Sequence, residues 1–133
     1  MRVADLMQTD LKTIGVDATV ADAVAVLAAT RLSALPVVDR FGRAVGVVST
    51  REILEAESRC DGPAARERLF ERTLVLEVMA PWPVTVSADA DVTEAAWRMV
   101  CVGEPRLFVE DHGRLAGVIS QTDIVGAVAT AEI

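Results

Sequence analysis

The chain has 133 residues, of which 52% are hydrophobic and 4% aromatic, and its 13 basic and 20 acidic residues give a net charge of −7. Such a surface repels polyanions, and because no basic stripe offsets it we expect no nucleic-acid partner. The longest apolar run, Ala23–Ala29, is far shorter than the roughly 20 residues that span a bilayer, and the N-terminus shows no secretory signal. We therefore expect a cytoplasmic protein without membrane insertion.

Side chains that carry catalysis or bind metals are scarce. The sequence has one histidine, His112, and two cysteines. Cys101 lies in an apolar helical stretch and is expected in the core, whereas Cys60 reads as a free surface cysteine, with a reactive thiol as the alternative. With no Cys or His cluster, nucleophile elbow or phosphate-cradling glycine loop, we expect neither an enzyme nor a metal site.

The sequence contains an internal duplication. "DLM" at Asp5–Met7 returns as "EVM" at Glu77–Met79, and "TIGVDATVADAV" from Thr13 returns as "TVSADADVTEAA" from Thr85, both at an offset of 72 residues. "DRFGRAVGVVS" then matches "DHGRLAGVIS" at an offset of 71. The duplication predicts two copies of one structural unit.

The pattern of each copy predicts the order strand, helix, strand, strand, helix. The first helix is predicted to begin at Thr19, with Asp22 closing a capping box, and its counterpart at Asp91, with Glu94 in the same role. Helical spacing predicts one buried stripe on each of these two helices, made of Val20, Val24 and Leu27 and of Val92, Ala96 and Met99.

Two hairpins and three further helices complete the pattern. "LPVVDRFGRAVGVVS" predicts two strands joined by a turn at Gly42, and "RLFVEDHGRLAGVIS" does the same around Gly113. A helix follows each hairpin, starting near Ser49 and near Ser120. Pro63 is well placed to begin a short connecting helix.

These elements predict an α/β (α+β) fold of tandem β-α-β-β-α repeats. We assign the first repeat to residues 1–58, a connector with a short helix to 59–72, and the second repeat to 73–133. A half of about 60 residues buries little surface alone, so we expect the halves to depend on each other.

The motif that closes each copy has two interpretations. In "GVVSTREI" and "GVISQTDI", a serine at the start of a helix is followed three residues later by an acid, Glu52 or Asp123. Such a pair can simply satisfy the first backbone amides of the helix. The same groups can also hold a ligand, because the helix N-terminus attracts phosphate and the carboxylate accepts from ribose hydroxyls.

The doubled set of motifs resembles a pair of CBS domains, the Bateman module, over essentially all 133 residues. The residues that carry the resemblance are "LPVVD", "GVVSTREI" and "GVISQTDI", together with "DLM" and "EVM". The resemblance implies that the tandem repeats are related by a pseudo-twofold axis. It also implies two clefts that bind adenosine derivatives such as AMP, ADP, ATP or S-adenosylmethionine as regulatory ligands, with no cofactor required. It also implies a homodimer that regulates a separate target protein, whose identity the sequence does not give.

By the same resemblance, each cleft combines the serine and acid of one repeat with residues of the other. One cleft would hold Ser120, Asp123, Thr13, Ala34 and Leu35, and the second would hold Ser49, Glu52, Thr85, Arg106 and Leu107. Ala34 stands where family members often carry a basic residue, and Glu52 replaces the usual aspartate. Phe108, in place of a proline, is expected to pack in the core or stack on a base, and Trp82 to line the second cleft or pack on the surface.

The functional expectation is a stand-alone regulatory module that senses an adenine nucleotide or a related adenosyl ligand and acts on a partner. The alternative is a ligand-free interaction and dimerisation module with degenerate clefts.

Overall fold

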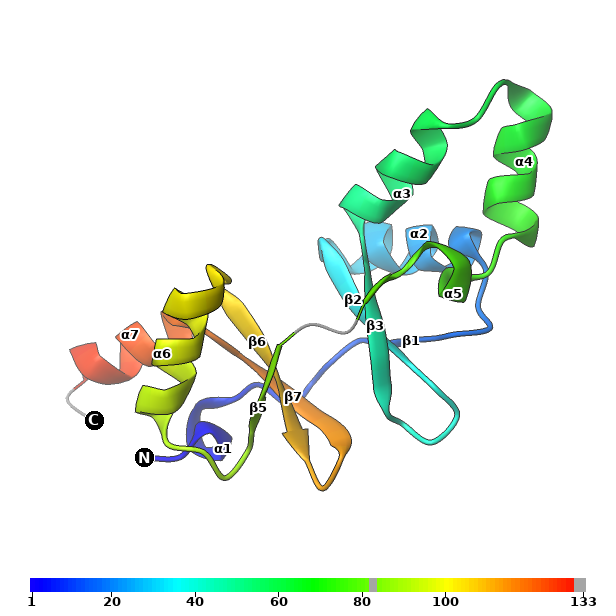
Figure 1. Cartoon of the computed structure of the whole chain (residues 1–133). Helices are drawn as coiled ribbons and strands as arrows, with labels where there is room; N and C mark the ends of the chain where they lie inside the picture. Colours follow the sequence, from blue (N-terminus) through cyan, green and yellow to red (C-terminus); the bar gives the residue numbers. More distant parts are fainter. Residues whose placement is uncertain (82–83, 131–133) are drawn as a thin grey trace. The chain divides into compact units, whose positions relative to one another are not determined.

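The computed structural model describes residues 1–81 and 84–130, which form two units (Figure 1). Unit 1 comprises Met1–Leu11 and Pro83–Ile133, and unit 2 comprises Lys12–Trp82. Each unit contains a small β-sheet, helices packed on it and its own hydrophobic core. Among the residues that the structure describes, no helix has both the length and the apolar character needed to cross a membrane.

Unit 2 contains most of the first repeat and the connector. Its elements are β1 (Ile14–Gly15), α2 (Val20–Thr30), β2 (Ala34–Val38), β3 (Ala44–Ser49), α3 (Thr50–Ser58), α4 (Pro63–Arg72), α5 (Val75–Val78) and β4 (Ala80–Pro81). The strands lie in the order β1-β2-β3-β4, with β1 parallel to β2 and the other pairs antiparallel. Pro63 begins α4 as predicted.

Unit 1 contains most of the second repeat. Its elements are α1 (Val3–Leu6), β5 (Thr85–Ser87), α6 (Val92–Val102), β6 (Arg106–Asp111), β7 (Arg114–Ser120) and α7 (Gln121–Ala129). The strands lie in the order β5-β6-β7, with β5 parallel to β6 and β6 antiparallel to β7. The order strand, helix, strand, strand, helix predicted for each repeat is therefore confirmed.

The buried stripes of α2 and α6 differ by one position from the predicted ones. On α2 the side chains of Val20, Ala23 and Leu27 are buried, and Val24 is only half-buried. The counterparts on α6 are Val92, Ala95 and Met99. Spacings of three and four residues both fit a helical turn, so the pattern alone does not decide between neighbouring positions on the helix.

One predicted capping box is confirmed and the other is wrong. At the start of α2, the Thr19 amide donates to the Asp22 carboxylate at 3.0 Å and the Asp22 amide donates to the Thr19 hydroxyl at 3.2 Å. At the start of α6, Asp91 instead accepts from the Thr93 amide at 2.9 Å, while Glu94 forms an ion pair with Arg98 at 3.1 Å.

The Asp91 carboxylate takes local donors instead, because it accepts from both the amide and the hydroxyl of Thr93, at 2.9 and 2.8 Å. The Thr93 amide and, secondarily, its hydroxyl stabilise the ionised form of Asp91, so they hold the pKa of this carboxyl below its ordinary value.

The two cysteines lie elsewhere than predicted from their sequence context. Cys101 is exposed rather than buried, because it lies on the side of α6 opposite the buried stripe. Cys60, expected at the surface, is half-buried beside the core of unit 2, and its thiol lies 3.7 Å from the Ala56 carbonyl oxygen.

The opening segment of each repeat belongs to the other unit. Residues 1–11 complete unit 1, where the backbone of Gln8 exchanges hydrogen bonds with Val118 at 2.8 and 3.0 Å. In the same way α5 and β4 complete unit 2, where the Val75 amide donates to the Ala18 carbonyl at 2.7 Å. The units thus do not coincide with the duplicated sequences, and the predicted repeat boundaries at 58 and 73 stay a prediction.

Two glycines allow the opening segment of each repeat to pack against the sheet of the other unit. A Cβ atom on Gly117 would lie 2.6 Å from the Gln8 carbonyl oxygen, and one on Gly46 would lie 2.6 Å from the Ala80 carbonyl oxygen. Both neighbours are backbone atoms that are themselves held in the sheets, so neither can move aside.

We therefore expect Gly117→Ala to destabilise the protein by about 1–3 kcal/mol through overpacking. Gly126→Ala is the matched control, because a Cβ there meets nothing within 4 Å and Gly126 lies inside α7. Alanine at this helical position should raise the free energy of unfolding by up to about 1 kcal/mol. Urea denaturation of both variants measures the difference, and an equal effect of the two substitutions would contradict the steric argument.

Candidate functional site

In each repeat, the second strand of the hairpin is followed directly by a helix, and we call this junction a corner. The Ser120 corner consists of Ser120, Asp123 and two neighbours in unit 1, Gln8 and Arg106. The Ser49 corner is its counterpart in unit 2 and consists of Ser49, Glu52 and Ala34. Helices α7 and α3 begin directly after these two serines, as the sequence predicts.

A closed set of hydrogen bonds orients the carboxylate in the Ser120 corner. The Ser120 amide donates to Oδ2 of Asp123 at 2.9 Å, and the Asp123 amide donates to the Ser120 hydroxyl at 3.1 Å. Nε2 of Gln8 donates to Oδ1 of Asp123 at 3.2 Å. Each carboxylate oxygen keeps a further lone pair, and the Ser120 hydroxyl keeps its proton for another acceptor.

Arg106 adds a positive charge beside this carboxylate. It is the first residue of β6 and lies directly opposite Ser120 on β7, and residues in that relation project side chains from the same face of the sheet. The Arg106 side chain is exposed, and among the residues that the structure describes none forms an ion pair with it. Its guanidinium is thus available to an anion.

The Ser49 corner has the same backbone and different chemistry. The Ser49 amide donates to Oε2 of Glu52 at 2.9 Å, and the Ser49 hydroxyl donates to the same oxygen. The longer side chain of glutamate lets one carboxylate oxygen take both donors, so the hydroxyl proton is already used. Ala34 lies opposite Ser49, where Arg106 lies opposite Ser120, and it brings no charge.

The other predicted site residues lie at or beside the ends of strands. Leu35 and Leu107 are buried, with 0% and 2% exposure, so their side chains belong to the cores and only their backbone could meet a ligand. Thr13 is exposed just before β1. Thr85 is half-buried at the start of β5, and its carbonyl accepts from Nη1 of Arg98 at 2.6 Å, a contact that we did not predict.

Within each unit the structure brings together residues that the sequence assigned to different clefts. Unit 1 holds Ser120 and Asp123 with Arg106, and unit 2 holds Ser49 and Glu52 with Ala34. The pairing of each corner with residues of the other repeat stays a prediction, and Trp82 lies outside the described residues.

Sequence reasoning missed Gln8. The signal was present, because the repeat offset of 72 aligns Gln8 with Ala80, so that "DLMQ" answers "EVMA". One copy of this motif is followed by a polar side chain and the other by a small apolar one. This difference predicts that the two corners have different hydrogen-bonding groups. Within the described part of the chain, no group of three or more His, Cys, Asp or Glu side chains is arranged to hold a metal ion.

The model of the CBS-domain family matches residues 3–59 and 75–130. The chain belongs to the CBS-domain family. A CBS domain-containing protein of Dictyostelium discoideum is 32% identical over 127 residues, which cover 92% of this chain and 88% of that protein. Inosine-5′-monophosphate dehydrogenase of Mycobacterium leprae is 31% identical over 121 residues, which cover 90% of this chain and 21% of the enzyme.

The fold is shared with solved CBS structures. The structure of CBSX2 in complex with AMP superposes with a TM-score of 0.78 at 25% identity, covering 99% of this chain and 98% of that one. The tandem repeats and the mixed α/β architecture are therefore those of a CBS-domain pair.

Capping by Ser120 should be measurable without any ligand. Ser120→Ala removes the acceptor of the Asp123 amide, so we expect a loss of about 1 kcal/mol in the free energy of unfolding. Faster hydrogen exchange at the Asp123 amide should report the same loss locally. Ser120→Thr keeps the hydroxyl and should restore most of both values. Unchanged exchange in the alanine variant would show that the cap contributes nothing.

Proposed function

We propose that the Ser120 corner binds the ribose and phosphate of an adenine nucleotide, and that this CBS pair regulates a separate partner protein in response. The observation that carries the proposal is the convergence in one unit of a carboxylate, a hydroxyl, a helix N-terminus and an arginine that has no ion pair among the described residues.

Each group of the corner has a matching part of the ligand. The remaining lone pairs of Asp123 can accept from both ribose hydroxyls, a charge-assisted contact of about 1.5–3 kcal/mol. The N-terminus of α7 favours a negative charge, and the Arg106 guanidinium matches a phosphate in charge and geometry. Gln8 holds the carboxylate in place from the side.

Among the adenosine ligands, those with phosphate suit this corner best. AMP, ADP and ATP bring anionic groups for Arg106, whereas S-adenosylmethionine brings a positive sulfonium. The AMP complex of CBSX2, at 25% identity, supports the assignment of an adenine nucleotide.

What the chain shares with its relatives supports regulation rather than catalysis. The match to inosine-5′-monophosphate dehydrogenase spans 21% of that enzyme, so the shared part is a module of the enzyme. A module of this kind acts by binding: it takes the nucleotide and passes a change in stability or shape to a target protein. We propose that it does so as a homodimer.

A ligand-free interaction module is the second candidate, and the Ser49 corner favours it. There the serine hydroxyl and amide both donate to Glu52, and Ala34 provides no charge for phosphate. We therefore assign binding to the Ser120 corner alone.

Thermal unfolding with AMP, ADP, ATP, NAD or S-adenosylmethionine tests the proposal. A ligand at one hundred times its Kd adds about 2.7 kcal/mol of stability, which should raise Tm by several degrees. Asp123→Ala should weaken AMP binding by about tenfold or more, as expected for a lost charge-assisted contact.

Asp22→Ala is the matched control, because Asp22 closes the same capping box at Thr19 outside the proposed site. Both variants should lose helix-capping stability, and only Asp123→Ala should lose the response to AMP. If no ligand shifts Tm at millimolar concentration, the nucleotide proposal is wrong and the interaction module is favoured. Equal loss of the response in both variants would assign it to stability rather than to the site.

A further inference from the structure

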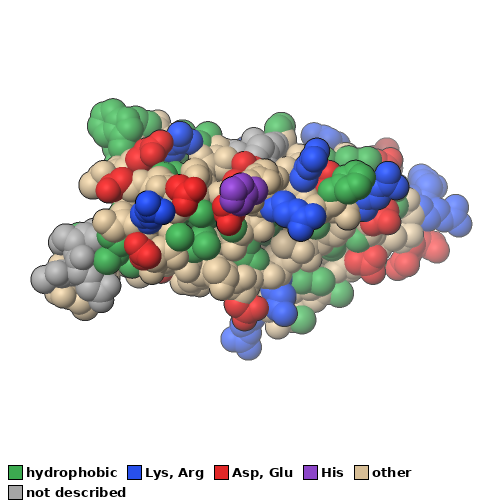
Figure 2. Space-filling model, turned by 90° about the horizontal axis from the view of Figure 1, so that it is seen from below, with side chains coloured by type: hydrophobic (Ala, Val, Ile, Leu, Met, Phe, Trp, Pro, Cys, Tyr) green, Lys and Arg blue, Asp and Glu red, His purple; other side chains and the backbone are tan. Residues whose placement is uncertain are grey.

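The hairpin of unit 2 ends in a loop that carries an exposed aromatic ring between two arginines. Residues 39–43 form this loop between β2 and β3, and Figure 1 shows it projecting from the sheet on the side away from α2 and α3. Arg40, Phe41 and Arg43 are all exposed, and we call these three residues the basic tip. Figure 2 views the molecule from the side on which the loop projects, and it shows hydrophobic side chains bordered directly by Lys and Arg.

The loop is held in shape by its own hydrogen bonds. Oδ1 of Asp39 accepts from the amides of Phe41 and Arg43, at 2.8 and 3.0 Å, so this carboxylate is engaged within the loop. The Asp39 amide donates to the Arg43 carbonyl at 2.9 Å, and the Gly42 amide donates to the Asp39 carbonyl at 3.1 Å. A loop that is already ordered loses little conformational entropy when it binds a partner.

The aromatic ring lies close to both guanidinium groups. The Cζ atoms of Arg40 and Arg43 lie 4.8 and 5.8 Å from the centroid of the Phe41 ring, which is within cation–π distance. The Phe41 side chain is nevertheless 55% exposed. Among the residues that the structure describes, no acidic side chain forms an ion pair with either arginine. Both guanidinium groups are therefore available to an anion, beside an accessible apolar surface.

The hairpin can form without this tip, as the second repeat demonstrates. At the offset of 71, Arg43 corresponds to Arg114, and the second turn has His112 in place of Arg40 and Phe41. An exposed phenylalanine is therefore not needed to close the turn. A single exposed apolar residue is ordinary on a protein surface, but a phenylalanine between two arginines combines residue types that are enriched at interfaces.

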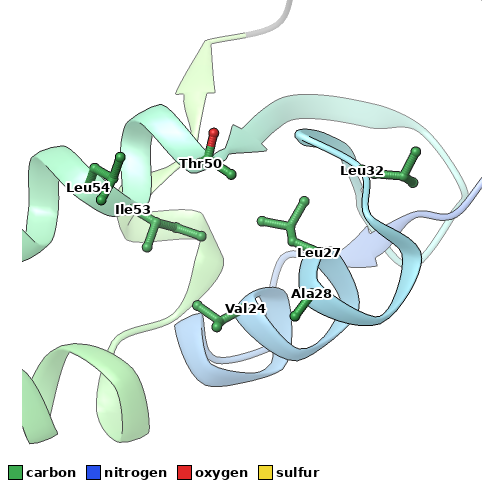
Figure 3. Close-up of a pocket in the computed structure, with 7 residues that line it drawn as sticks. All are labelled: Val24, Leu27, Ala28, Leu32, Thr50, Ile53 and Leu54. Carbon is green, nitrogen blue, oxygen red and sulfur yellow. The ribbon is translucent and has the colours of Figure 1, made fainter.

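The basic tip is separate from the other surfaces of unit 2 described so far. The Ser49 corner lies at the opposite ends of β2 and β3. An apolar groove lies between α2 and α3, and Figure 3 shows Val24, Leu27 and Ile53 directed into it. None of the described residues that line this groove is charged. An anionic partner therefore finds its ionic contacts at the tip and not in the groove.

The charge of the chain indicates which anionic partner suits the tip. The net charge of −7 repels extended polyanions, and two arginines are too few to hold a nucleic acid or an anionic membrane against it. A short acidic segment of a protein brings only a few charges. Its carboxylates match the planar guanidinium groups in bidentate geometry, and an aliphatic side chain between them can pack on the Phe41 ring.

We propose that the basic tip docks a separate protein, and that it takes an exposed segment in which acidic residues flank an aliphatic one. The proposal rests on the proposed function in one respect only, the existence of a separate partner protein. It requires no nucleotide at the Ser120 corner and no second copy of the chain. The small size of the tip suits a weak and reversible contact, in which arginine and aromatic side chains supply most of the binding energy.

Fluorescence anisotropy with labelled peptides tests the docking on the full chain. The probe peptide has a leucine flanked on both sides by glutamates, and the control peptide has glutamines in their place. We expect only the glutamate peptide to bind, and its affinity should fall as the salt concentration rises. Phe41→Ser and Arg43→Gln should each weaken binding about fivefold or more, as for the loss of one interface contact.

Arg114→Gln is the matched control for Arg43→Gln. Arg114 has the corresponding place in the second hairpin, is exposed, and its substitution changes the net charge equally, so this variant should bind the peptide like the wild type. Circular dichroism should show all variants folded, because each altered side chain is exposed. The rise of Tm with AMP should be the same in all of them, so the nucleotide proposal and the docking proposal can fail separately.

Four outcomes would overturn the proposal. One is a wild type that does not bind the glutamate peptide, and another is equal binding of the glutamine peptide. A third is an equal loss of binding in Arg43→Gln and Arg114→Gln, which would assign the effect to overall charge. The fourth is binding of the tip to phosphatidylserine vesicles in place of the peptide, which would assign it to a membrane surface. Peptide binding at the tip in a protein that does not respond to AMP would support the docking and remove only the nucleotide proposal.

Discussion

The close approach of two backbones at Gly117 is the constraint on which unit 1 depends. The Gln8 carbonyl oxygen lies 2.6 Å from where a Cβ atom on Gly117 would stand, and the Gln8 backbone pairs with Val118. This contact ties the first residues of the chain to the second repeat. It also brings the Gln8 amide to Asp123, so one steric requirement both completes the sheet edge and orients the candidate ligand-binding carboxylate.

Duplication preserved the backbone of the two corners and let their side chains diverge. Asp123 leaves the hydroxyl of its serine with a free proton, whereas Glu52 takes both donors of Ser49. The residue opposite the serine is Arg106 in one corner and alanine in the other. The two corners thus differ in the length of the acidic side chain and in the charge opposite the serine. Because of these differences, the Ser120 corner can bind an anion, whereas the donors of the Ser49 corner are already paired within it. The same divergence placed exposed Trp97 and Val100 on α6, where α2 has Ala25 and Ala28 at the repeat offset.

Local signals predicted most of the helix starts correctly. The capping box at Thr19, the helix start at Pro63 and the helix starts after both corner serines were predicted and are present. The box at Asp91 was predicted wrongly, because its carboxylate accepts from the Thr93 amide and hydroxyl while Glu94 pairs with Arg98. Cys101 was misplaced because an apolar neighbourhood in sequence does not say which side of a helix faces the core.

The sequence by itself determined the repeat, the order of the elements, the helix starts and the candidate serines and acids, because periodicity and capping act over a few residues. Only the tertiary structure decided which unit each opening segment completes, that Gln8 meets Asp123 across 115 residues, and that Arg106 stands opposite Ser120. Those contacts depend on strand register and on the room left by a glycine, and both arise only when distant segments are packed together.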